Sequence, residues 1–394
     1  MRATRETPGS QTSLREANRA RIVNAVQQHG SLTQVELAGI TGLSPASVSN
    51  IVKELTAAGV LDTSPSTRSG RRARLVTLAR SLGLVGGVDF SARTLRVALA
   101  DASLQIIASE ELPLAPDHRA DMGLHRAALL IQEMAASVGA EAGELLAVGV
   151  GVPAPVDVAS GAVTSSGLLR GWDGAAVAAA LTAALDVPVT VDNDANLGAL
   201  AEARYGAGVG HDPVVYVRAS HGLGGGIVLG GRVLHGRGGA AGEIGHVTID
   251  ENGPICRCGN RGCLETFVGA TVLLGMLSAS HGHLTLADVI ARAHDGDPGC
   301  RRVLSDAGAH LGAAAANLAN LVDPEVLVVG GRLADAGEIL LGPLRAAVEQ
   351  RTVPSEAGPP LVAVAEFGAE AELRGALAVA LDHARAAGLL GVGA

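Results

Sequence analysis

Apolar residues recur at helical spacing three times within the first sixty residues of the chain. They predict helices over residues 14–29, 34–41 and 45–58. Each helix would bury one apolar face, and the residues expected on these faces are Ile22, Val23, Val26, Val48, Ile51 and Leu55. Gly30 and Gly42 follow the first two helices, where a left-handed residue commonly ends a helix. The pattern therefore predicts a small three-helix unit with tight turns.

Polar residues at the expected helix starts support these boundaries. Thr33 and Glu36 have the spacing of a capping box, in which a hydroxyl and a carboxylate each bond the other residue's backbone amide. Ser44 followed by Pro45 combines an N-cap with a residue suited to the first helical position. Two short helices joined by a tight turn at Gly42 predict a helix-turn-helix motif.

The outer side of the third helix carries small polar residues, which allow a helix to lie deep in the DNA major groove. The residues expected to contact DNA here are Ser44, Ala46, Ser47, Ser49, Asn50 and Lys53. Apolar positions at 60–61 and 75–78 then predict two paired strands with an arginine-rich turn. Such a wing suits phosphates or a narrow minor groove, and its expected contacts are Arg71, Arg72 and Arg74. A three-helix unit used only for protein contacts is the alternative.

Charge separates the first eighty residues from the rest of the chain. Residues 1–80 hold 11 basic and 5 acidic residues, whereas the remaining residues hold 19 basic and 34 acidic ones. A basic head on an acidic body indicates that only the head meets a polyanion, although a solvated basic surface would carry the same charge. Together with the helix and the wing, the charge favours a winged helix-turn-helix domain over residues 1–80 that binds double-stranded operator DNA.

From residue 84 onward, apolar strands alternate with alanine-rich helices, which predicts a layered α/β body over residues 84–394. The expected elements are strands at residues 86–90, 95–99, 105–110 and 146–152 and a helix at residues 122–137. With 48% hydrophobic but only 2% aromatic residues, the cores must consist mainly of Ala, Val, Leu and Ile. We expect no signal peptide and no membrane-spanning segment, and hence a cytoplasmic protein.

Cysteine spacing predicts a metal site in residues 243–265. Three cysteines fall within eight positions and a histidine precedes them by ten; these residues are Cys256, Cys258, Cys263 and His246. Three thiolates and one imidazole form a closed tetrahedral ligand set for a structural zinc ion. Unrelated buried cysteines are the alternative, and Cys300 is expected to be a packed thiol. Clustered thiols without a disulfide framework also fit a reducing cytoplasm.

The same segment carries a family resemblance. Residues 242–246 read Gly-Glu-Ile-Gly-His and are followed by Cys-x-Cys-Gly-x-x-Gly-Cys-x-Glu, which resembles the signature of the ROK family. That family contains bacterial sugar kinases and sugar-responsive transcriptional repressors. The resemblance extends from about residue 84 to the C-terminus, and the head resembles the winged helix-turn-helix of the repressors. It implies a two-lobed actin-like body of the RNase H-like, hexokinase type, with sugar bound between the lobes, in a homodimer or homotetramer.

Residues 191–196, Val-Asp-Asn-Asp-Ala-Asn, resemble the family segment that holds the sugar. The resemblance implies that Asp194 matches the catalytic base of the kinases and is vestigial here. The ligand-binding residues it implies are Asn193, Asp194, Glu243, His246 and Glu265. His246 would bind zinc through one ring nitrogen and face the sugar with the other. The alternative for residues 193–196 is a turn with an Asx cap before a helix that begins at Leu197.

Two loops depart from the phosphate-binding pattern of the kinases. Residues 89–93 read Asp-Phe-Ser-Ala-Arg where the kinases carry Asp-x-Gly-Gly-Thr. Residues 220–224 read Ser-His-Gly-Leu-Gly where they carry Gly-Thr-Gly-x-Gly. Backbone must approach phosphate closely at these places, and added side chains prevent that approach. The departing residues are Ser91, Ala92, Arg93 and His221, and Arg93 is the one alternative phosphate ligand among them.

Two further segments bear on whether the chain resembles the kinases or the repressors of the family. Gly330 and Gly331 match the adenosine-side loop of the kinases, whereas residues 168–172 lack an asparagine that the kinases use for the sugar. The sequence therefore predicts a sugar-responsive transcriptional repressor without catalytic activity, released from its operator by a mono- or oligosaccharide. An ATP-dependent hexose kinase that carries a DNA-binding head is the alternative, and a repressor that has lost its ligand is a third possibility.

Overall fold

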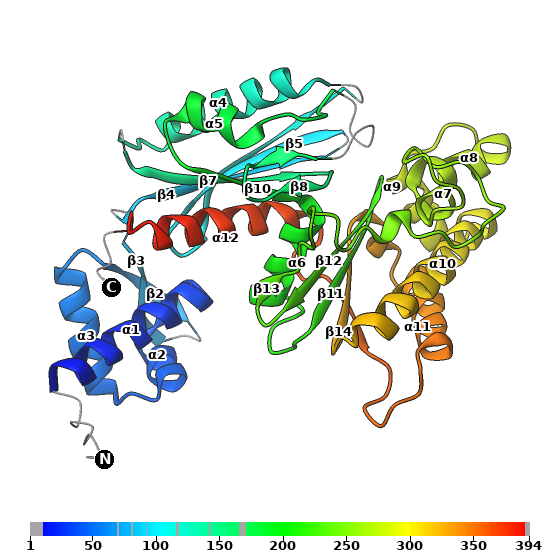
Figure 1. Ribbon diagram of the computed structural model, residues 1–394. Coiled ribbons are helices and arrows are strands. Elements are labelled where there is room, and N and C mark those ends of the chain that lie inside the picture. Colours follow the sequence, from blue (N-terminus) through cyan, green and yellow to red (C-terminus); the bar gives the residue numbers. More distant parts are fainter. Residues whose placement is uncertain are drawn as a thin grey trace, which may run out of the picture.

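The computed structural model describes residues 11–68, 71–79, 82–91, 93–115, 118–141, 143–164 and 171–390 (Figure 1). The head consists of helices α1 (Gln11–His29), α2 (Gln34–Thr41) and α3 (Pro45–Ala57) and strands β1 (Leu32–Thr33), β2 (Leu61–Arg68) and β3 (Arg71–Leu78). The strands form one sheet in the order β1-β3-β2. The predicted three-helix unit and wing are therefore confirmed, and β1 adds a strand that the sequence pattern did not reveal.

The helix starts of the head follow from the predicted caps. The Thr33 hydroxyl accepts a hydrogen bond from the Glu36 amide, and the Glu36 carboxylate accepts one from the Thr33 amide at 2.7 Å. Ser44 accepts from the Ser47 amide at 3.2 Å, and Pro45 is the first residue of α3. The six apolar side chains expected inside are all buried: Ile22, Val23, Val26, Val48, Ile51 and Leu55.

The body contains two five-stranded sheets. The first has the order β10-β7-β4-β5-β6, formed by β4 (Leu84–Phe90), β5 (Thr94–Asp101), β6 (Ile106–Pro113), β7 (Leu145–Val152) and β10 (Val189–Asn193). The second has the order β13-β12-β11-β14-β15, formed by β11 (Val214–Ala219), β12 (Leu223–Leu229), β13 (Arg232–Val233), β14 (Val326–Gly330) and β15 (Leu361–Val364). The predicted strands of the first sheet are confirmed, each slightly longer than expected.

The two sheets have the same topology. In the first, β4, β5 and β6 form an antiparallel meander, β7 lies parallel to β4, and β10 lies parallel to β7. The second repeats this pattern with β11, β12 and β13 as the meander and β14 and β15 as the parallel strands. The body therefore consists of two lobes that repeat one strand arrangement, as the two-lobed α/β fold requires.

Helices cover both faces of each sheet (Figure 1). Helices α4 (Ala120–Ser137) and α5 (Val177–Leu185) cover the outer face of the first sheet. The outer core of the second contains residues of α7 (Glu265–Val268), α8 (Ala270–His281), α9 (Leu286–His294), α10 (Pro298–Val322) and α11 (Glu338–Arg351). Helices α6 (Asp194–Tyr205) and α12 (Ala371–Ala386) lie between the sheets. Alternate residues of β11 accordingly face different cores, with Val215 and Val217 outward and Tyr216 inward.

Glycines allow α12 to approach its neighbours closely. A Cβ atom on Gly149 of β7 would lie 1.9 Å from the carbonyl oxygen of Ala376. A Cβ atom on Gly375 of α12 would lie 2.0 Å from the carbonyl oxygen of Leu197 in α6. Because any other residue would clash with backbone at these two places, α12 is packed tightly between the first sheet and α6.

The head and the body share one apolar cluster. Leu61 and Leu78 of the head belong to the same buried cluster as Val85 of β4 and Leu377 and Leu381 of α12. The Leu78 amide also donates a hydrogen bond to Oγ of Ser103 at 3.3 Å. The head therefore packs against the body beside the C-terminal end of α12 (Figure 1).

Among the described residues, no single helix is long and apolar enough to cross a membrane. In the described part of the chain, one bent pair of segments, Glu265–His281 and Leu286–His294, meets that length and composition when the two are taken together.

Candidate functional site

A cavity of about 450 Å³ lies between the two lobes. All five residues predicted to bind a sugar line it: Asn193, Asp194, Glu243, His246 and Glu265. The turn between β4 and β5 contributes Ser91 and Arg93, and the turn between β11 and β12 contributes His221. The fold thus brings the predicted sugar residues and the two loops that the sequence predicts to be altered phosphate loops to one cavity.

Asn193 caps helix α6 with its side chain. Its Oδ1 accepts hydrogen bonds from the backbone amides of Ala195 and Asn196 at 2.9 and 3.3 Å. The helix therefore begins at Asp194, and the expected start at Leu197 is wrong because Asn193 caps the chain directly. The Asx-cap interpretation describes the backbone here, and a contact between Asn193 and a sugar stays a prediction.

Asp194 is buried in an ion pair with Arg218. Its Oδ2 lies 2.9 Å from Nη1 of Arg218, and only 3% of its side chain is exposed. Burial raises the pKa of Asp194 to about 6; Arg218 opposes this rise, and the nearby carboxylates of Asp89 and Glu243 strengthen it. A general base must accept a proton from the attacking hydroxyl. The adjacent guanidinium of Arg218 limits the rise, so Asp194 is ionised at neutral pH and can accept a hydrogen bond or a proton.

The same guanidinium contacts a second carboxylate, which belongs to α12. Nε of Arg218 lies 3.1 Å from Oε1 of Glu372, which also accepts a hydrogen bond from the Tyr216 hydroxyl at 3.1 Å. Arg96 of β5 donates to Asp89 at 2.7 Å and lies 3.6 Å from Oε2 of Glu372. Burial raises the pKa of Glu372 to about 7, with Arg218 opposing the rise. A buried ion cluster therefore forms one wall of the cavity.

Sequence reasoning missed Arg218, Arg96 and Glu372. A signal for Arg218 was present, because it is the only charged residue in the apolar strand Val214–Ala219. A charge in such a strand is stable only with a buried partner. The identity of that partner could not be read from the chain, since Glu372 lies far away in the sequence.

Glu265 is held by an arginine of the cysteine-rich loop. Nε of Arg257 lies 2.8 Å from Oε1 of Glu265, and its Nη2 donates to Oε2 at 3.0 Å. Glu265 also accepts a hydrogen bond from the Leu223 amide at 3.3 Å. Burial raises the pKa of the neighbouring Glu243 to about 6, an effect that Arg257 opposes. The two carboxylates thus present several hydrogen-bond acceptors to a polyhydroxylated ligand.

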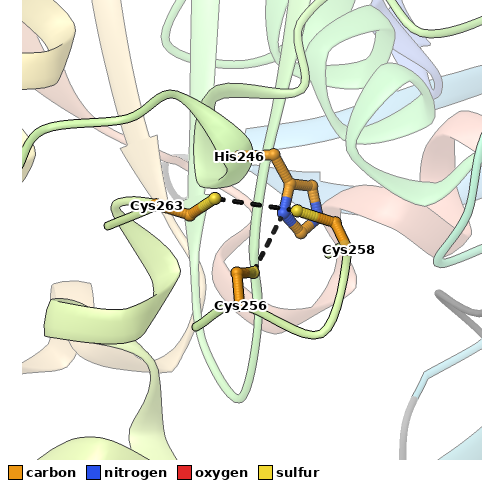
Figure 2. Close-up of side chains that lie close together, drawn as sticks. All are labelled: His246, Cys256, Cys258 and Cys263. Carbon is orange, nitrogen blue, oxygen red and sulfur yellow. Dashed lines mark hydrogen bonds between the residues drawn. The ribbon is translucent and has the colours of Figure 1, made fainter. Parts of the chain in front are cut away.

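The four predicted metal ligands lie together (Figure 2). The ligand atoms of His246, Cys256, Cys258 and Cys263 all lie within 4.8 Å of one another. Nδ1 of His246 faces the cysteines, 3.5 Å from Sγ of Cys256, while its Nε2 lies 4.0 Å from Oε2 of Glu243. The imidazole therefore points one nitrogen at the cluster and the other at the pocket, as predicted from its two expected roles.

The spacing of these atoms fits a tetrahedral metal ion. Metal bonds of about 2.3 Å to sulfur and about 2.0 Å to nitrogen would separate two sulfurs by about 3.8 Å, and a sulfur and a nitrogen by about 3.5 Å. Sγ of Cys258 lies 3.7 Å from Sγ of Cys263, and Sγ of Cys256 lies 3.5 Å from Nδ1 of His246. Burial raises the pKa of the Cys263 thiol to about 12, and a bound cation would favour its thiolate form.

Cys300 lies outside this cluster, next to His281 and Asp297. Asp297 caps α10 by accepting a hydrogen bond from the Cys300 amide at 2.8 Å, and it contacts Nε2 of His281 at 3.1 Å. The carboxylate oxygens are therefore used by the fold. Cys300 is buried, in agreement with the predicted packed thiol.

In the turn between β4 and β5, a side chain of the turn itself bonds the backbone amides. The Ser91 hydroxyl accepts hydrogen bonds from the amides of Arg93 and Thr94 at 3.3 and 3.0 Å. The amides that would face a phosphate in a glycine-rich turn are therefore bonded within the turn itself. Arg93 lines the cavity, together with Arg332 and His221. Ala92 and residues 168–170 of the segment that lacks the expected asparagine lie outside the described residues.

Of the nine residues predicted to contact DNA, six are exposed in the head. Five of them are exposed on or next to α3: Ser44, Ala46, Ser49, Asn50 and Lys53. Ser47 is half-buried, and its hydroxyl lies 2.9 Å from Oγ of Ser44, so it belongs to the helix cap. Arg74 is exposed on β3 and donates to the Thr63 hydroxyl at 2.9 Å. Arg71 and Arg72 begin β3, where they pair with Arg68 and Thr67 of β2, and their side chains lie outside the described part.

In the comparison with known proteins, different family models match the head and the body. Residues 85–383 match the model of the ROK family, and residues 15–62 match a model of winged helix-turn-helix DNA-binding domains. The putative xylose repressor of Caldicellulosiruptor sp. (strain Rt8B.4) is 27% identical over 359 residues, 87% of this chain and 90% of that protein. The glucokinase of Halalkalibacterium halodurans is 32% identical over 305 residues, 73% of this chain and 92% of that enzyme.

A solved structure agrees with the longer match. The crystal structure of a ROK family transcriptional regulator, described as a homologue of the E. coli MLC protein, superposes with a TM-score of 0.73 at 27% identity. It covers 96% of this chain, and 98% of that regulator is matched. The repressor and the regulator thus extend over more of this chain than the glucokinase does. Because the family model spans most of the sequence and the regulator shares the whole architecture, this chain belongs to the ROK family.

Proposed function

We propose that this protein is a sugar-responsive transcriptional repressor that controls genes of carbohydrate uptake or catabolism. The head, residues 1–80, binds an operator through α3 and the wing, and the body, residues 84–394, binds a mono- or oligosaccharide that releases it. The observation that carries the proposal is the combination of a winged head with a polar inter-lobe cavity lined by Asn193, Asp194 and Glu243. The names of the longer-matching relatives support it.

One feature argues against a kinase that turns over. The Ser91 hydroxyl accepts hydrogen bonds from the amides of Arg93 and Thr94, which would face a phosphate in the first phosphate turn of the kinases. These amides are therefore not available to a nucleotide phosphate, which a sugar kinase must bind. The protein is therefore proposed to bind its sugar without phosphorylating it.

Zinc is the metal proposed for the cluster of His246 and the three cysteines. Three thiolates and one imidazole in a closed tetrahedron are typical of structural zinc, and no ligand position is left open for catalysis. The ion would fix the loop that carries Arg257, and it would orient His246 toward Glu243. The metal is thus proposed to preform one wall of the sugar pocket.

Recognition of a two-fold operator needs two heads, so a homodimer or homotetramer is proposed as the DNA-binding form. A sugar would then act by favouring a lobe arrangement that does not suit the spacing of the two heads. Operators selected from random duplexes should show two half-sites related by a two-fold axis. A selected site with a single half-site would contradict this assembly.

The decisive experiment combines DNA selection with a sugar screen. The full chain is used to select duplexes, and sugars including d-xylose and d-glucose are then tested for release of the selected operator. Coupled ATPase measurements on the same samples test the rival hypothesis. Release by a sugar without ATP turnover supports the proposal, whereas sugar phosphorylation by the wild-type chain would establish the kinase with a DNA-binding head.

A further inference from the structure

Arg218 joins two carboxylates that belong to different helices, and one of these helices extends to the head. We infer that Arg218 and Glu372 are positioning residues that transmit the occupancy of the pocket through helix α12 to the DNA-binding domain. The inference rests on the proposed function, because it needs a ligand in the cavity and an operator at the head. It assigns a route between the two sites.

The first step of the route is a shared guanidinium. Nη1 of Arg218 lies 2.9 Å from Oδ2 of Asp194, the first residue of α6, and its Nε lies 3.1 Å from Oε1 of Glu372 in the first turn of α12. Only 13% of the Arg218 side chain and 2% of the Glu372 side chain are exposed. Water therefore competes weakly for these charges, and a change in one ion pair alters the other.

The second step is the balance of charge in the cluster. Three carboxylates, those of Asp89, Asp194 and Glu372, share the two guanidiniums of Arg96 and Arg218. Four of these five residues, all except Asp89, line the cavity, so a bound ligand meets the cluster directly. A sugar hydroxyl that donates a hydrogen bond to Asp194 weakens the hold of this carboxylate on Arg218. Arg218 then binds Glu372 more strongly and draws the first turn of α12 toward β11.

The third step is the helix itself. Helix α12 has 16 residues and is therefore about 24 Å long. Gly149 and Gly375 pack it against the first sheet and α6 without room for a Cβ atom. Its apolar residues Leu377 and Leu381 belong to the same buried cluster as Leu61 and Leu78 of the head. A shift at the first turn is thus delivered to the surface on which the head packs.

Two matched substitutions in the N-terminal region of α12 test the route. Glu372→Gln removes the charge from the cluster, whereas Glu370→Gln removes an exposed charge that pairs only locally with Arg374. The measured quantity is the ratio of operator dissociation constants at saturating sugar and without sugar, with d-xylose and d-glucose as probes. Saturation makes the ratio independent of any change in sugar affinity, which calorimetry reports separately.

We expect the wild type and Glu370→Gln to show a ratio in the range of about 5–150, typical of coupled sites. Glu372→Gln should reduce this ratio to below about threefold while the protein still binds both ligands. Equal ratios in the two variants would overturn the inference and leave the proposed function intact. If neither sugar changes operator binding by the wild type, the proposed function fails in its sugar part and the inference fails with it.

A milder variant covers the case in which Glu372→Gln does not fold. Tyr216→Phe removes only the hydroxyl that donates to Glu372 at 3.1 Å and retains the buried ring. It should lower the ratio by about two- to fivefold, less than the loss of a whole hydrogen bond to a charged group, because Arg218 still holds Glu372. An unchanged ratio in Tyr216→Phe would contradict the proposed route. A residue with only a structural role would change the affinity for sugar or operator and leave the ratio as it is.

Discussion

Arg257 lies between two cluster cysteines in the sequence, and its guanidinium holds Glu265 of the pocket at 2.8 and 3.0 Å. The loop that a metal would fix is therefore joined directly to a carboxylate that lines the cavity. His246 adds a second link, because its two ring nitrogens face Cys256 and Glu243. This arrangement allows the effect of the metal on the pocket to be measured.

Cys258→Ser should lose the metal and weaken sugar binding. One zinc per chain is expected in the wild type, and loss of one thiolate opens the closed ligand set. Without a fixed loop, Arg257 no longer holds Glu265, and the sugar dissociation constant should rise at least about tenfold. Metal analysis and calorimetry check the two effects, with Cys300→Ser as the control that should retain both. A zinc-free variant with full sugar response would contradict the link.

Arg257→Lys distinguishes the effect of Arg257 on the pocket from the effect of the metal. Lysine keeps the charge but cannot form the two parallel bonds that the guanidinium makes to Glu265. Zinc content should stay at one per chain, while sugar affinity falls about tenfold, the effect of one strong hydrogen bond. Unchanged sugar affinity in this variant would show that Glu265 is positioned by other contacts, such as the Leu223 amide.

Arg74→Ala should weaken operator binding and lower the slope of its salt dependence by about one unit per lost phosphate contact. Arg71→Ala is expected to act in the same way from the start of β3. Asn50→Ala should instead change the sequence preference, because Asn50 is exposed on α3. Arg302→Ala is the control, since Arg302 is exposed on the body and pairs with Asp306. An equal effect of Arg74→Ala and Arg302→Ala would exclude the wing as a DNA contact.

Asp194→Asn distinguishes a sensor from an enzyme. In a kinase it would abolish turnover, because base catalysis is typically worth about 10²–10⁴ in rate. In a sensor it replaces one acceptor by an amide of similar shape, and sugar affinity should fall by about 1–3 kcal/mol. Sugar phosphorylation by the wild type that disappears in Asp194→Asn would overturn the repressor proposal.

Sugar binding should strengthen as the pH rises from 5 to 7.5. The pKa of Asp194 is raised to about 6, so this carboxyl is mostly protonated at pH 5 and ionised at pH 7.5. If the sugar hydroxyl donates to the ionised form, only about a tenth of the protein is competent at pH 5, and the apparent affinity is about tenfold lower there. The matched control Asp194→Asn should show a smaller step, because Glu243, whose pKa is also raised to about 6, lines the same cavity. A step of equal size in the two proteins would show that Asp194 does not accept from the sugar.

Features that depend on neighbours in the chain were predictable from the sequence. The caps at Thr33 and Ser44, and the metal ligands that lie close together in one loop, follow from local spacing. The start of α6 was misjudged because Asp194 suits both a loop and a first helical turn, and only the bonds of Asn193 decide between them. The Ser47 hydroxyl contacts the Ser44 hydroxyl, and its contact with DNA stays a prediction.

Features that depend on tertiary contacts were not predictable. Tyr216 and Glu372 are 156 positions apart, and no local pattern indicates that they share a hydrogen bond. The repeat of the two lobes was invisible for a related reason. Strand order is conserved between the sheets, but the residues that build each sheet need only alternate between faces, and many sequences satisfy that requirement.

The apolar cluster that joins Leu61 and Leu78 to Leu377 and Leu381 bears on how far head and body can be exchanged. A head detached from its body would expose this surface to solvent and should aggregate. A head taken from a relative would pack poorly against the body at the apolar contact beneath β3. We therefore expect a chimaera to fold and respond to its ligand only when α12 is transferred together with the head. The terminal helix thus has to be exchanged with the head, although it lies at the opposite end of the gene.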